Sequence, residues 1–513
     1  MNKPARTALL VAHTFPPIAV AGVFRILRFV KYLPEWGWRP VVVASPPRNA
    51  ETGCDAGLLA QVPASTIVDR PQMFDPEAWL GNLARRILGR KSSAGGDAAV
   101  AHSVAAARQG PNGHSLAPPA RSALETYLSR LQELLFRTPD ENVWWVLPAV
   151  RAGLREIKRT NPELIYTTGP PHSTHLAGLL LHLASGLPWV ADFRDPWSRL
   201  PWGQKRNLWG ARLLPYIEAE CVRHASCVIL NTGRMAHDFQ RHYHHFRRSK
   251  FVALPNGFDP ELRSVVGECL KDQKGGSRRK GAVRLCHAGT LYHQRDIRAL
   301  VDAVRQLSKS GVTVHFENIG FGGVNSDVEA YVRESGLAES ITFEDPIPHR
   351  DVLKRMAQSD VLVVIQPNNE LQVPGKLYEM MLFAKPMLAL ADEGELADLV
   401  RRYELGEVAR SSDANDITRA IGRLATAGQG DSKASRNGRT LDAFDGRLLT
   451  KRLAAIFEGV VRDFGHADIE RAAARDESHD AFVEVDPGEP AAHGSFDETI
   501  HERPRLAEVH HGT

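Results

Sequence analysis

The chain has 513 residues, which is too long for one ordinary domain and predicts two large units with additional segments. A hydrophobic content of 43% allows a sizeable core and excludes a largely disordered protein. The formal net charge of +4 is small for this length, so the sequence argues against a dedicated nucleic-acid binder.

The cysteines and apolar runs predict a cytoplasmic protein. The five cysteines are never spaced as the close pairs that zinc and redox sites use, which is typical of a reducing compartment. The apolar run at 8–12 is too short for a signal peptide. The most apolar later segment, 176–191, is interrupted by His182, Gly186 and Pro188. We therefore expect neither a signal peptide nor a transmembrane helix.

The first half of the chain alternates apolar strands with helical patterns. The run at 7–15 ends at a Pro-Pro turn, apolar residues then follow at helical spacing to about Pro34, and a continuous β-branched run occupies 40–45. Similar strands, each followed by a loop and a helical pattern, recur at 163–168, 188–193 and 227–232. This order predicts a doubly wound parallel sheet in an N-terminal α/β domain over 1–265.

A second alternating series predicts a second domain of the same class. Its strands are expected at 283–289, 313–320, 340–346, 360–366 and 386–391. The polar, glycine-containing segment 266–281 is interpreted as a linker, so the second domain spans 282–440. Residues 89–122 lack apolar periodicity and predict a flexible insertion, and 465–513 predict a disordered acidic tail.

Glycine-bearing loops follow several predicted strands. They contain Gly22, Gly289 with Thr290, Gly320, and Gly375, the last just before a helix. Backbone amides of such loops hold nucleotide phosphates. A tight turn explains any one glycine, but ligands of open α/β sheets bind at the carboxyl ends of strands, where these loops are placed together. Together they indicate a nucleotide site.

The motifs around these loops resemble the family-4 retaining glycosyltransferases, which have two Rossmann-like domains in the GT-B fold. The resemblance covers nearly all of 7–464. Its N-terminal marks are FPPIAVAGVFRILRFVKYLPEWGW (15–38), TTGPPHS (167–173), ADFRDPW (191–197) and LPNGFD (254–259). Its C-terminal marks are HAGTLYHQRDIRALVDAV (287–304), IGFGG (319–323) and the most specific, PGKLYEMMLFAKPMLAL (374–390). A subgroup with a D-x-R-D-x-W segment is the nearest match.

The resemblance implies transfer of a sugar from a nucleotide-diphosphate sugar to a sugar or lipid-linked saccharide acceptor, with retention of anomeric configuration. The N-terminal domain would bind the acceptor and the C-terminal domain the donor. A helix at 441–464 would pack back on the first domain. The setting implied is cell-surface, exopolysaccharide or glycolipid biosynthesis, in the cytoplasm or at the inner face of the membrane.

The resemblance also implies roles for individual residues. Glu379 would accept hydrogen bonds from ribose, and Lys376 and Arg295 would lie at the diphosphate. Gly22 and Arg25 would approach the donor from the other domain. The remaining predicted donor-site residues are Gly289, Thr290, Gly320 and Gly375.

The candidate catalytic or acceptor-site residues are His172, Arg194 and Asp195. An arginine–carboxylate network that fixes a loop explains Asp192, Arg194 and Asp195 equally well. Packing at a helix N-terminus likewise explains His172.

Two departures from the family pattern keep other functions open. Leu371 stands where many members have a first glutamate, and Thr290 stands where many have arginine. A catalytically silent family member, acting as a partner subunit, is therefore one alternative. A nucleotide-sugar epimerase of the same fold is another, and it would turn over the donor without an acceptor.

Neither a metal nor a cofactor is expected. The sequence has no Asp-x-Asp, the usual carboxylate clamp for a divalent ion on a sugar nucleotide. Residues 79–91 form a basic amphipathic pattern, which either contacts an anionic membrane surface or packs on the N-terminal domain.

Overall fold

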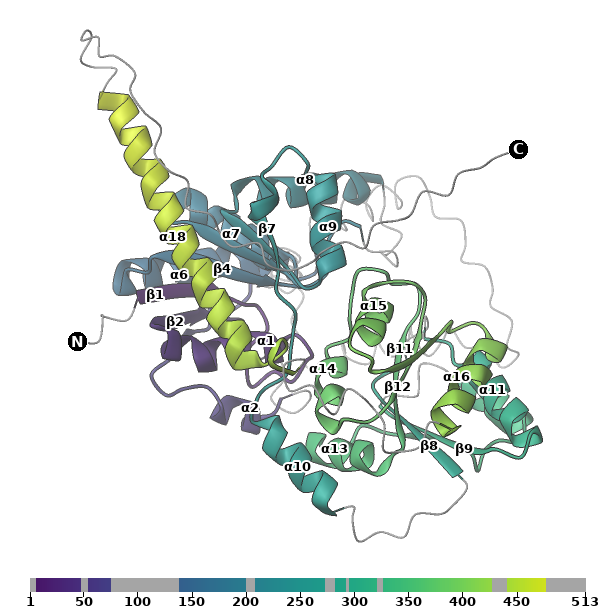
Figure 1. The fold of residues 1–513 in the computed structure, drawn as a ribbon. Helices are drawn as coiled ribbons and strands as arrows, with labels where there is room; N and C mark the ends of the chain where they lie inside the picture. The colour runs from purple at the N-terminus through teal and green to yellow at the C-terminus, as the bar shows by residue number, and fades with distance from the viewer. Residues whose placement is uncertain are drawn as a thin grey trace, which may run out of the picture. The chain divides into compact units, whose positions relative to one another are not determined.

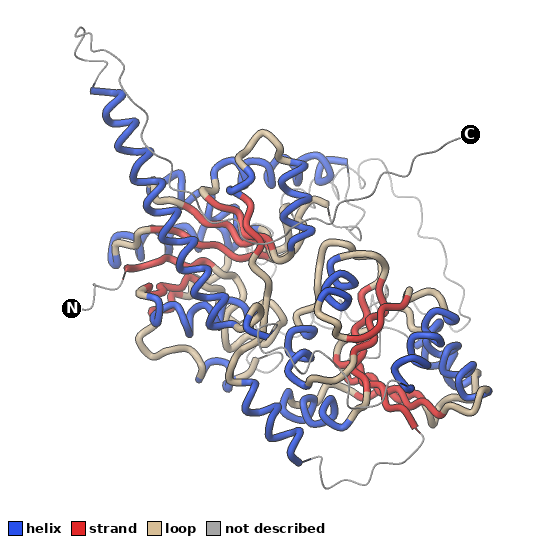
Figure 2. The backbone as a smooth tube through the Cα atoms, in the orientation of Figure 1, coloured by secondary structure: helices blue, strands red, loops and turns tan. Residues whose placement is uncertain are grey.

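The computed structural model describes residues 6–47, 54–74, 138–199, 208–272, 282–291, 295–320, 326–426 and 441–476. The expected insertion at 89–122, the amphipathic pattern at 79–91 and the tail beyond 476 lie outside these residues. The described chain forms two parallel sheets with helices between their strands, which confirms the predicted GT-B class (Figures 1 and 2). No described helix is both long and apolar enough to cross a membrane.

The N-terminal sheet has the order β3-β2-β1-β4-β5-β6-β7, and all described neighbours run parallel. Its strands are β1 (Arg6–Val11), β2 (Trp38–Val43), β3 (Ile67–Asp69), β4 (Leu164–Gly169), β5 (Trp189–Phe193), β6 (Cys227–Leu230) and β7 (Phe251–Ala253). Its helices are α1 (Val23–Tyr32), α2 (Ala56–Ala60), α6 (Val146–Thr160), α7 (Ser173–Ser185), α8 (Leu208–His224) and α9 (Gly233–His242). The strand order reverses between β1 and β4, which is where ligands of such sheets bind.

Both faces of this sheet are covered. Leu9 and Val11 point into a core shared with α6 to α9, whereas Ala8 and Leu10 point into a core shared with α1. A strand buried on both faces needs apolar residues at successive positions. This is why β1 reads as a continuous apolar run in the sequence.

The C-terminal sheet has the order β10-β9-β8-β11-β12-β13, again parallel. Its strands are β8 (Ala282–Ala288), β9 (Thr313–Ile319), β10 (Ile341–Glu344), β11 (Val361–Gln366), β12 (Met387–Ala391) and β13 (Gly406–Ala409). The helices of this half are α10 (Leu262–Asp272), α11 (Arg298–Lys309), α12 (Ser326–Glu334), α13 (His349–Gln358), α14 (Lys376–Met380), α15 (Glu395–Arg402) and α16 (Ala414–Thr426). The order reverses between β8 and β11.

Two boundaries differ from the sequence expectations. Residues 266–272 of the expected linker belong to α10, because Val266 and Cys269 pack at helical spacing against α13 in the C-terminal core. Residues 465–476 of the expected tail continue helix α18 (Gly446–Asp476), whose last turns are rich in strong helix formers.

Three edge strands, β3, β7 and β13, are not predicted from the sequence. Each has only three or four residues. Such a short strand at the edge of a sheet needs no long apolar run, so periodicity alone does not reveal it.

The chain crosses between the domains at two paired segments, residues 255–258, called the crossing segment below, and residues 444–446. Phe258 N–H donates to the carbonyl of Phe444 at 3.0 Å, and Gly446 N–H donates to the carbonyl of Phe258 at 2.9 Å. Gly257 has φ +66°, and a Cβ there would lie 2.4 Å from the Phe444 carbonyl oxygen. Glycine is therefore required where the two segments approach each other.

Helix α18 returns the chain to the N-terminal core. Leu449, Leu453 and Phe457 pack in the cluster that also contains Ala8 and Leu10. The Phe457 ring meets Trp38 edge-on, with centroids 5.3 Å apart. The first turns of α18 (Figure 1) thus complete the face of the sheet that α1 covers.

This packing gives a stability prediction. Leu453 is fully buried on α18, whereas Leu448 on the same helix is 40% exposed. We expect Leu453→Ala to lower the free energy of unfolding by about 2–3 kcal/mol, because it leaves a cavity in the core. Leu448→Ala, the matched control, should change it by less than about 0.5 kcal/mol. Urea denaturation measures both, and equal losses for the two variants would show that α18 does not pack in this way.

Candidate functional site

Arg25, in the first turns of α1, lies in a buried network of the N-terminal domain. Its Nε and Nη2 donate to the two carboxylate oxygens of Asp192 at 2.7 and 2.9 Å. The hydroxyls of Tyr166 and Thr168 donate to the same carboxylate. Arg25 Nη1 donates to the Pro255 carbonyl at 2.9 Å, and only 2% of the residue is exposed. This arrangement favours a role in fixing α1, β4, β5 and the crossing segment over direct contact with a donor.

Arg194 ties three backbone segments together. Its Nε donates to the carbonyl of Gly169 at 3.1 Å, Nη1 to that of Gly22 at 2.5 Å, and Nη2 to that of Pro170. Burial lowers the pKa of the guanidinium. A Cβ on Gly22 would lie 2.2 Å from Nη1, so glycine permits this approach. These contacts support the loop-fixing interpretation of Arg194.

His172 and Asp195 occupy two neighbouring loops of the same domain. The His172 ring stacks on Trp197 with centroids 4.8 Å apart, and the residue is 8% exposed. Asp195 Oδ1 accepts a hydrogen bond from the side-chain amide of Gln372, which belongs to the C-terminal domain. Burial raises the pKa of Asp195. Asp195 therefore has a side-chain contact with the other domain.

Glu379 is the centre of a charged cluster at the start of α14. Lys376 Nζ lies 3.2 Å and His349 Nε2 lies 3.1 Å from Glu379 Oε2. Burial alone would raise the pKa of Glu379, but Lys376 and His349 lower it to about 2. The carboxylate is therefore ionised at neutral pH, and its Oε1 has no hydrogen-bond partner among the described residues. An ionised oxygen of this kind accepts hydroxyl donors.

The Glu379 cluster lies near residues of the N-terminal half. Burial lowers the pKa of Arg28, on α1, to about 10, and the negative charge of Glu379 is one of the charges that opposes this shift. Arg28 donates to the backbone carbonyl of Asn256 in the crossing segment. A Cβ on Gly375 would lie 3.9 Å from the Asn256 side chain. The structure therefore brings Gly375, Lys376 and Glu379 to the junction of the domains.

A second group of predicted residues gathers at the ends of β8, β9 and β11. Arg295 Nη1 donates to the Thr290 carbonyl at 3.0 Å, and Nη2 donates to Gln366 Oε1 at 3.1 Å. Gly320 has φ +154°, and a Cβ there would lie 2.4 Å from the carbonyl oxygen of Gly289. The two glycine loops therefore meet where the strand order reverses, next to a cation.

Beneath these loops lies a buried polar residue that the sequence did not single out. His287 Nδ1 lies 3.0 Å from the Val363 carbonyl, and burial lowers the pKa of His287 to about 4. The imidazole is thus neutral near pH 7, and its Nδ1 carries the proton. Among the described residues its Nε2 has no hydrogen-bond partner.

Sequence reasoning also missed Gln372, His349 and Asn256. Each forms a hydrogen bond with a residue that is distant in the sequence: Gln372 with Asp195, His349 with Glu379, and Asn256 with Arg28. The LPNGFD motif was the one available signal, and it includes Asn256. Within the described chain, no group of three or more His, Cys, Asp or Glu side chains could hold a metal ion.

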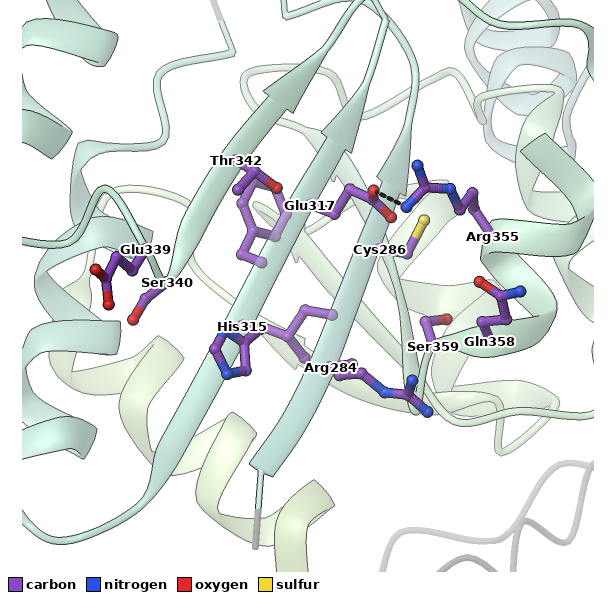
Figure 3. A pocket seen from close by; sticks show the side chains of 12 residues that line it. Arg284, Cys286, His315, Glu317, Glu339, Ser340, Thr342, Arg355, Gln358 and Ser359 are labelled. Carbon is purple, nitrogen blue, oxygen red and sulfur yellow. Dashed lines mark hydrogen bonds and ion pairs between the residues drawn. The ribbon is translucent and has the colours of Figure 1, made fainter. Parts of the chain in front are cut away.

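A pocket of about 220 Å³ lies elsewhere on the C-terminal sheet, along β8, β9 and the start of β10 beside the end of α13 (Figure 3). Arg355, at one side of the pocket, forms ion pairs with Glu317 at 2.8 Å and Glu344 at 3.0 Å. None of the predicted site residues lines this pocket. We assign no ligand to it, because Glu317 and Arg355, its closest opposite charges, neutralise each other.

Comparisons with known proteins match both halves of the chain. A sequence model described as "Glycosyltransferase Family 4" matches residues 103–262, and one described as "Glycosyl transferases group 1" matches 282–427. A curated relative, 2-deoxystreptamine glucosyltransferase from Streptomyces kanamyceticus, is 28% identical over 174 residues. That match spans 33% of this chain and 44% of the relative, so the chain covers less than half of the relative's length.

Solved structures share the architecture over most of the chain. HepE from Anabaena, in complex with UDP and glucose, has a TM-score of 0.56 and 16% identity, over 88% of this chain and 99% of that one. WaaG, a glycosyltransferase involved in lipopolysaccharide biosynthesis, has a TM-score of 0.52 and 13% identity, over 87% and 99%. At these identities the likeness concerns the fold. Both matched sequence models and the curated relative are described as glycosyltransferases, and the two parallel-sheet domains have the GT-B fold of these solved structures.

Proposed function

We propose that this protein transfers a sugar from a nucleotide-diphosphate sugar to a saccharide or lipid-linked saccharide acceptor. The observation that carries the proposal is the Glu379 carboxylate at the start of α14, which is kept ionised at the domain junction and whose Oε1 has no hydrogen-bond partner among the described residues. Ribose presents two adjacent hydroxyls, which an ionised carboxylate accepts. The HepE structure with UDP and glucose shows that a protein of this fold holds such groups.

In the proposed donor site, cations stabilise the leaving diphosphate. Lys376 is 32% exposed in its side chain and lies three residues before Glu379, so both face the same side of α14. Arg295 lies across the ends of β8 and β11 beside the two glycine loops. Negative charge grows on the diphosphate as the bond to the sugar breaks, and positive charges held in place lower that barrier.

The finer parts of the proposal concern stereochemistry and setting. Transfer of a hexose is supported by the name of the glucosyltransferase relative. Retention of anomeric configuration rests on the family resemblance of the PGKLYE motif. The acceptor would bind in the N-terminal domain, near His172 and Asp195. Biosynthesis of a cell-surface polysaccharide or glycolipid, in the cytoplasm or at the inner membrane face, fits the name of WaaG.

Two alternatives have less support. An epimerase would convert the donor without an acceptor, and a silent partner subunit would bind no donor. The family descriptions and the relative's name all specify transferases, which does not favour either alternative. The test is release of nucleoside diphosphate from a panel of nucleotide sugars, with and without saccharide acceptors. Release that requires an acceptor supports the proposal, and conversion to an epimer without one refutes it.

Turnover is expected to be independent of divalent metal. The sequence has no Asp-x-Asp, and Lys376 and Arg295 supply positive charge in the proposed site. Activity measured in excess chelator should equal that in magnesium. Loss of activity in chelator, with recovery on adding manganese or magnesium, would refute this prediction.

A further inference from the structure

The loop after β11 is a point where the C-terminal domain contacts the N-terminal domain. The Leu371 carbonyl accepts a hydrogen bond from Thr232 Oγ1 at 2.5 Å. The next residue, Gln372, donates its side-chain amide to Asp195 Oδ1. Gln372 is 9% exposed, so its amide is largely shielded from water. A shielded hydrogen bond to a carboxylate is among the stronger ones in proteins.

The orientation of the Gln372 amide is fixed by its own loop. Its Oε1 accepts from Asn369 Nδ2 at 2.5 Å, and its backbone N–H donates to Asn369 Oδ1 at 3.1 Å. Because Oε1 is used in this way, the NH₂ group must face Asp195. Asn369 is itself 5% exposed. The donor-domain loop therefore presents a preset hydrogen-bond donor to the other domain.

The loop is anchored on both sides within its own domain. Asn368 N–H donates to Asp392 Oδ2 at 2.9 Å, and Glu395 N–H donates to the Glu370 carbonyl at 2.9 Å. The strand before it ends at Gln366, which holds Arg295. The position of Gln372 is thus tied to the region that we propose binds the diphosphate.

Asp195 receives a side-chain hydrogen bond from this loop. The guanidinium of the preceding residue, Arg194, donates hydrogen bonds to three backbone carbonyls. Among the described residues, Asp195 Oδ1 has Gln372 as its hydrogen-bond partner and Oδ2 has none. One carboxylate oxygen of Asp195 is therefore held by a residue of the donor domain.

We propose that Gln372 is a positioning residue, which holds Asp195 in its working geometry only while the loop 368–372 of the donor domain is docked on the acceptor domain. This inference rests on the proposed function and adds to it a coupling between the two substrate sites. Docking of the donor domain then sets the orientation of the acceptor-side carboxylate.

The first test compares Gln372→Leu with Gln240→Leu. Gln240 lies on α9, and its side-chain amide donates to the backbone carbonyls of Arg248 and Phe251, so its replacement serves as a matched control outside the site. Loss of a hydrogen bond to a charged group predicts that Gln372→Leu lowers kcat for transfer by about 10- to 100-fold. The Kd for the donor, measured by titration without acceptor, should stay within about threefold, because the described side-chain contacts of Gln372 are with Asp195 and Asn369 and not with the proposed donor-site residues. The control should change neither quantity.

A second variant distinguishes a positioning role of Gln372 from a general disruption of the structure. Gln372→Glu places a carboxylate against Asp195 and should weaken docking, which small-angle scattering detects as a larger radius of gyration in the presence of nucleotide. When Asp195→Asn is added, the new side-chain amide at position 195 can donate to the new carboxylate at position 372. The hydrogen bond is thereby restored with donor and acceptor exchanged. The double variant should therefore regain the compact form but not kcat.

Unchanged kcat in Gln372→Leu, or a parallel loss of donor affinity, would overturn the inference. Failure of the double variant to regain the compact form would also overturn it. If the unmodified protein turned over no nucleotide sugar, the proposed function would fail, but the scattering comparison would still decide whether Gln372 and Asp195 hold the domains together.

Discussion

Replacing Lys376 by Ala is expected to lower turnover by about 100-fold, because a charge that stabilises the leaving group acts most strongly in the transition state. Replacing Glu379 by Gln should act differently. It removes an ionised acceptor from the proposed ribose contact, which should weaken nucleotide binding by roughly 10- to 100-fold. Lys376 and Glu379 form an ion pair at 3.2 Å, so each substitution also removes the ionic partner of the other residue. Even so, the main loss should be in turnover for Lys376→Ala and in nucleotide affinity for Glu379→Gln.

Nucleotide affinity by titration and turnover under saturating donor separate these two effects. Lys354→Ala is the matched control, because Lys354 forms an exposed ion pair with Asp351 on α13. If both Lys376→Ala and Glu379→Gln stayed within about threefold of the unmodified protein in affinity and turnover, the donor site would have to lie elsewhere.

Replacing Arg25 by Ala is expected to cost about 3–5 kcal/mol of folding free energy. The change leaves Asp192, which is fully buried, without its charged partner. An uncompensated buried charge is the reason that breaking such a pair costs far more than breaking a surface pair. The hydroxyls of Tyr166 and Thr168 would remain, but they do not neutralise the carboxylate.

Chemical denaturation measures this loss. Arg305→Ala, which removes an exposed pair with Asp302, should cost less than about 1 kcal/mol. The double variant Arg25→Met with Asp192→Leu should regain much of the stability, because replacing both partners with apolar groups removes the unpaired charge. A loss for Arg25→Ala no larger than that for Arg305→Ala would mean that the pair is not buried in solution.

The central strands of both sheets can be predicted from the sequence, because a continuous apolar run between turn residues is typical of a strand buried on both faces. β1 and β11 are buried on both faces and appear as nearly continuous apolar segments. Edge strands β3, β7 and β13 are too short for such a signal. Helix α10 was assigned to a linker because its few apolar residues, including Val266 and Cys269, are diluted by charged ones.

The site was predictable only where its residues are close in the sequence. Lys376 and Glu379 are three residues apart, and the motif that contains them indicates a shared face. Gln372 and Asp195 are 177 positions apart, and their contact depends on how two domains dock. Arg194 and Gly22 are also far apart in the sequence, and the hydrogen bond between them could not be predicted from it.

The central claim is that the C-terminal domain binds a nucleotide-diphosphate sugar through Glu379. Its most direct test is thermal unfolding of the unmodified protein and of Glu379→Gln, each with a panel of nucleotide sugars that begins with UDP-glucose. A ligand at 100 times its Kd should add roughly 2.7 kcal/mol to the unmodified protein. We expect at least one nucleotide sugar to raise the Tm of the unmodified protein and to do so much less for Glu379→Gln. Stabilisation of both proteins to the same extent, or of neither by any nucleotide sugar, would contradict the account.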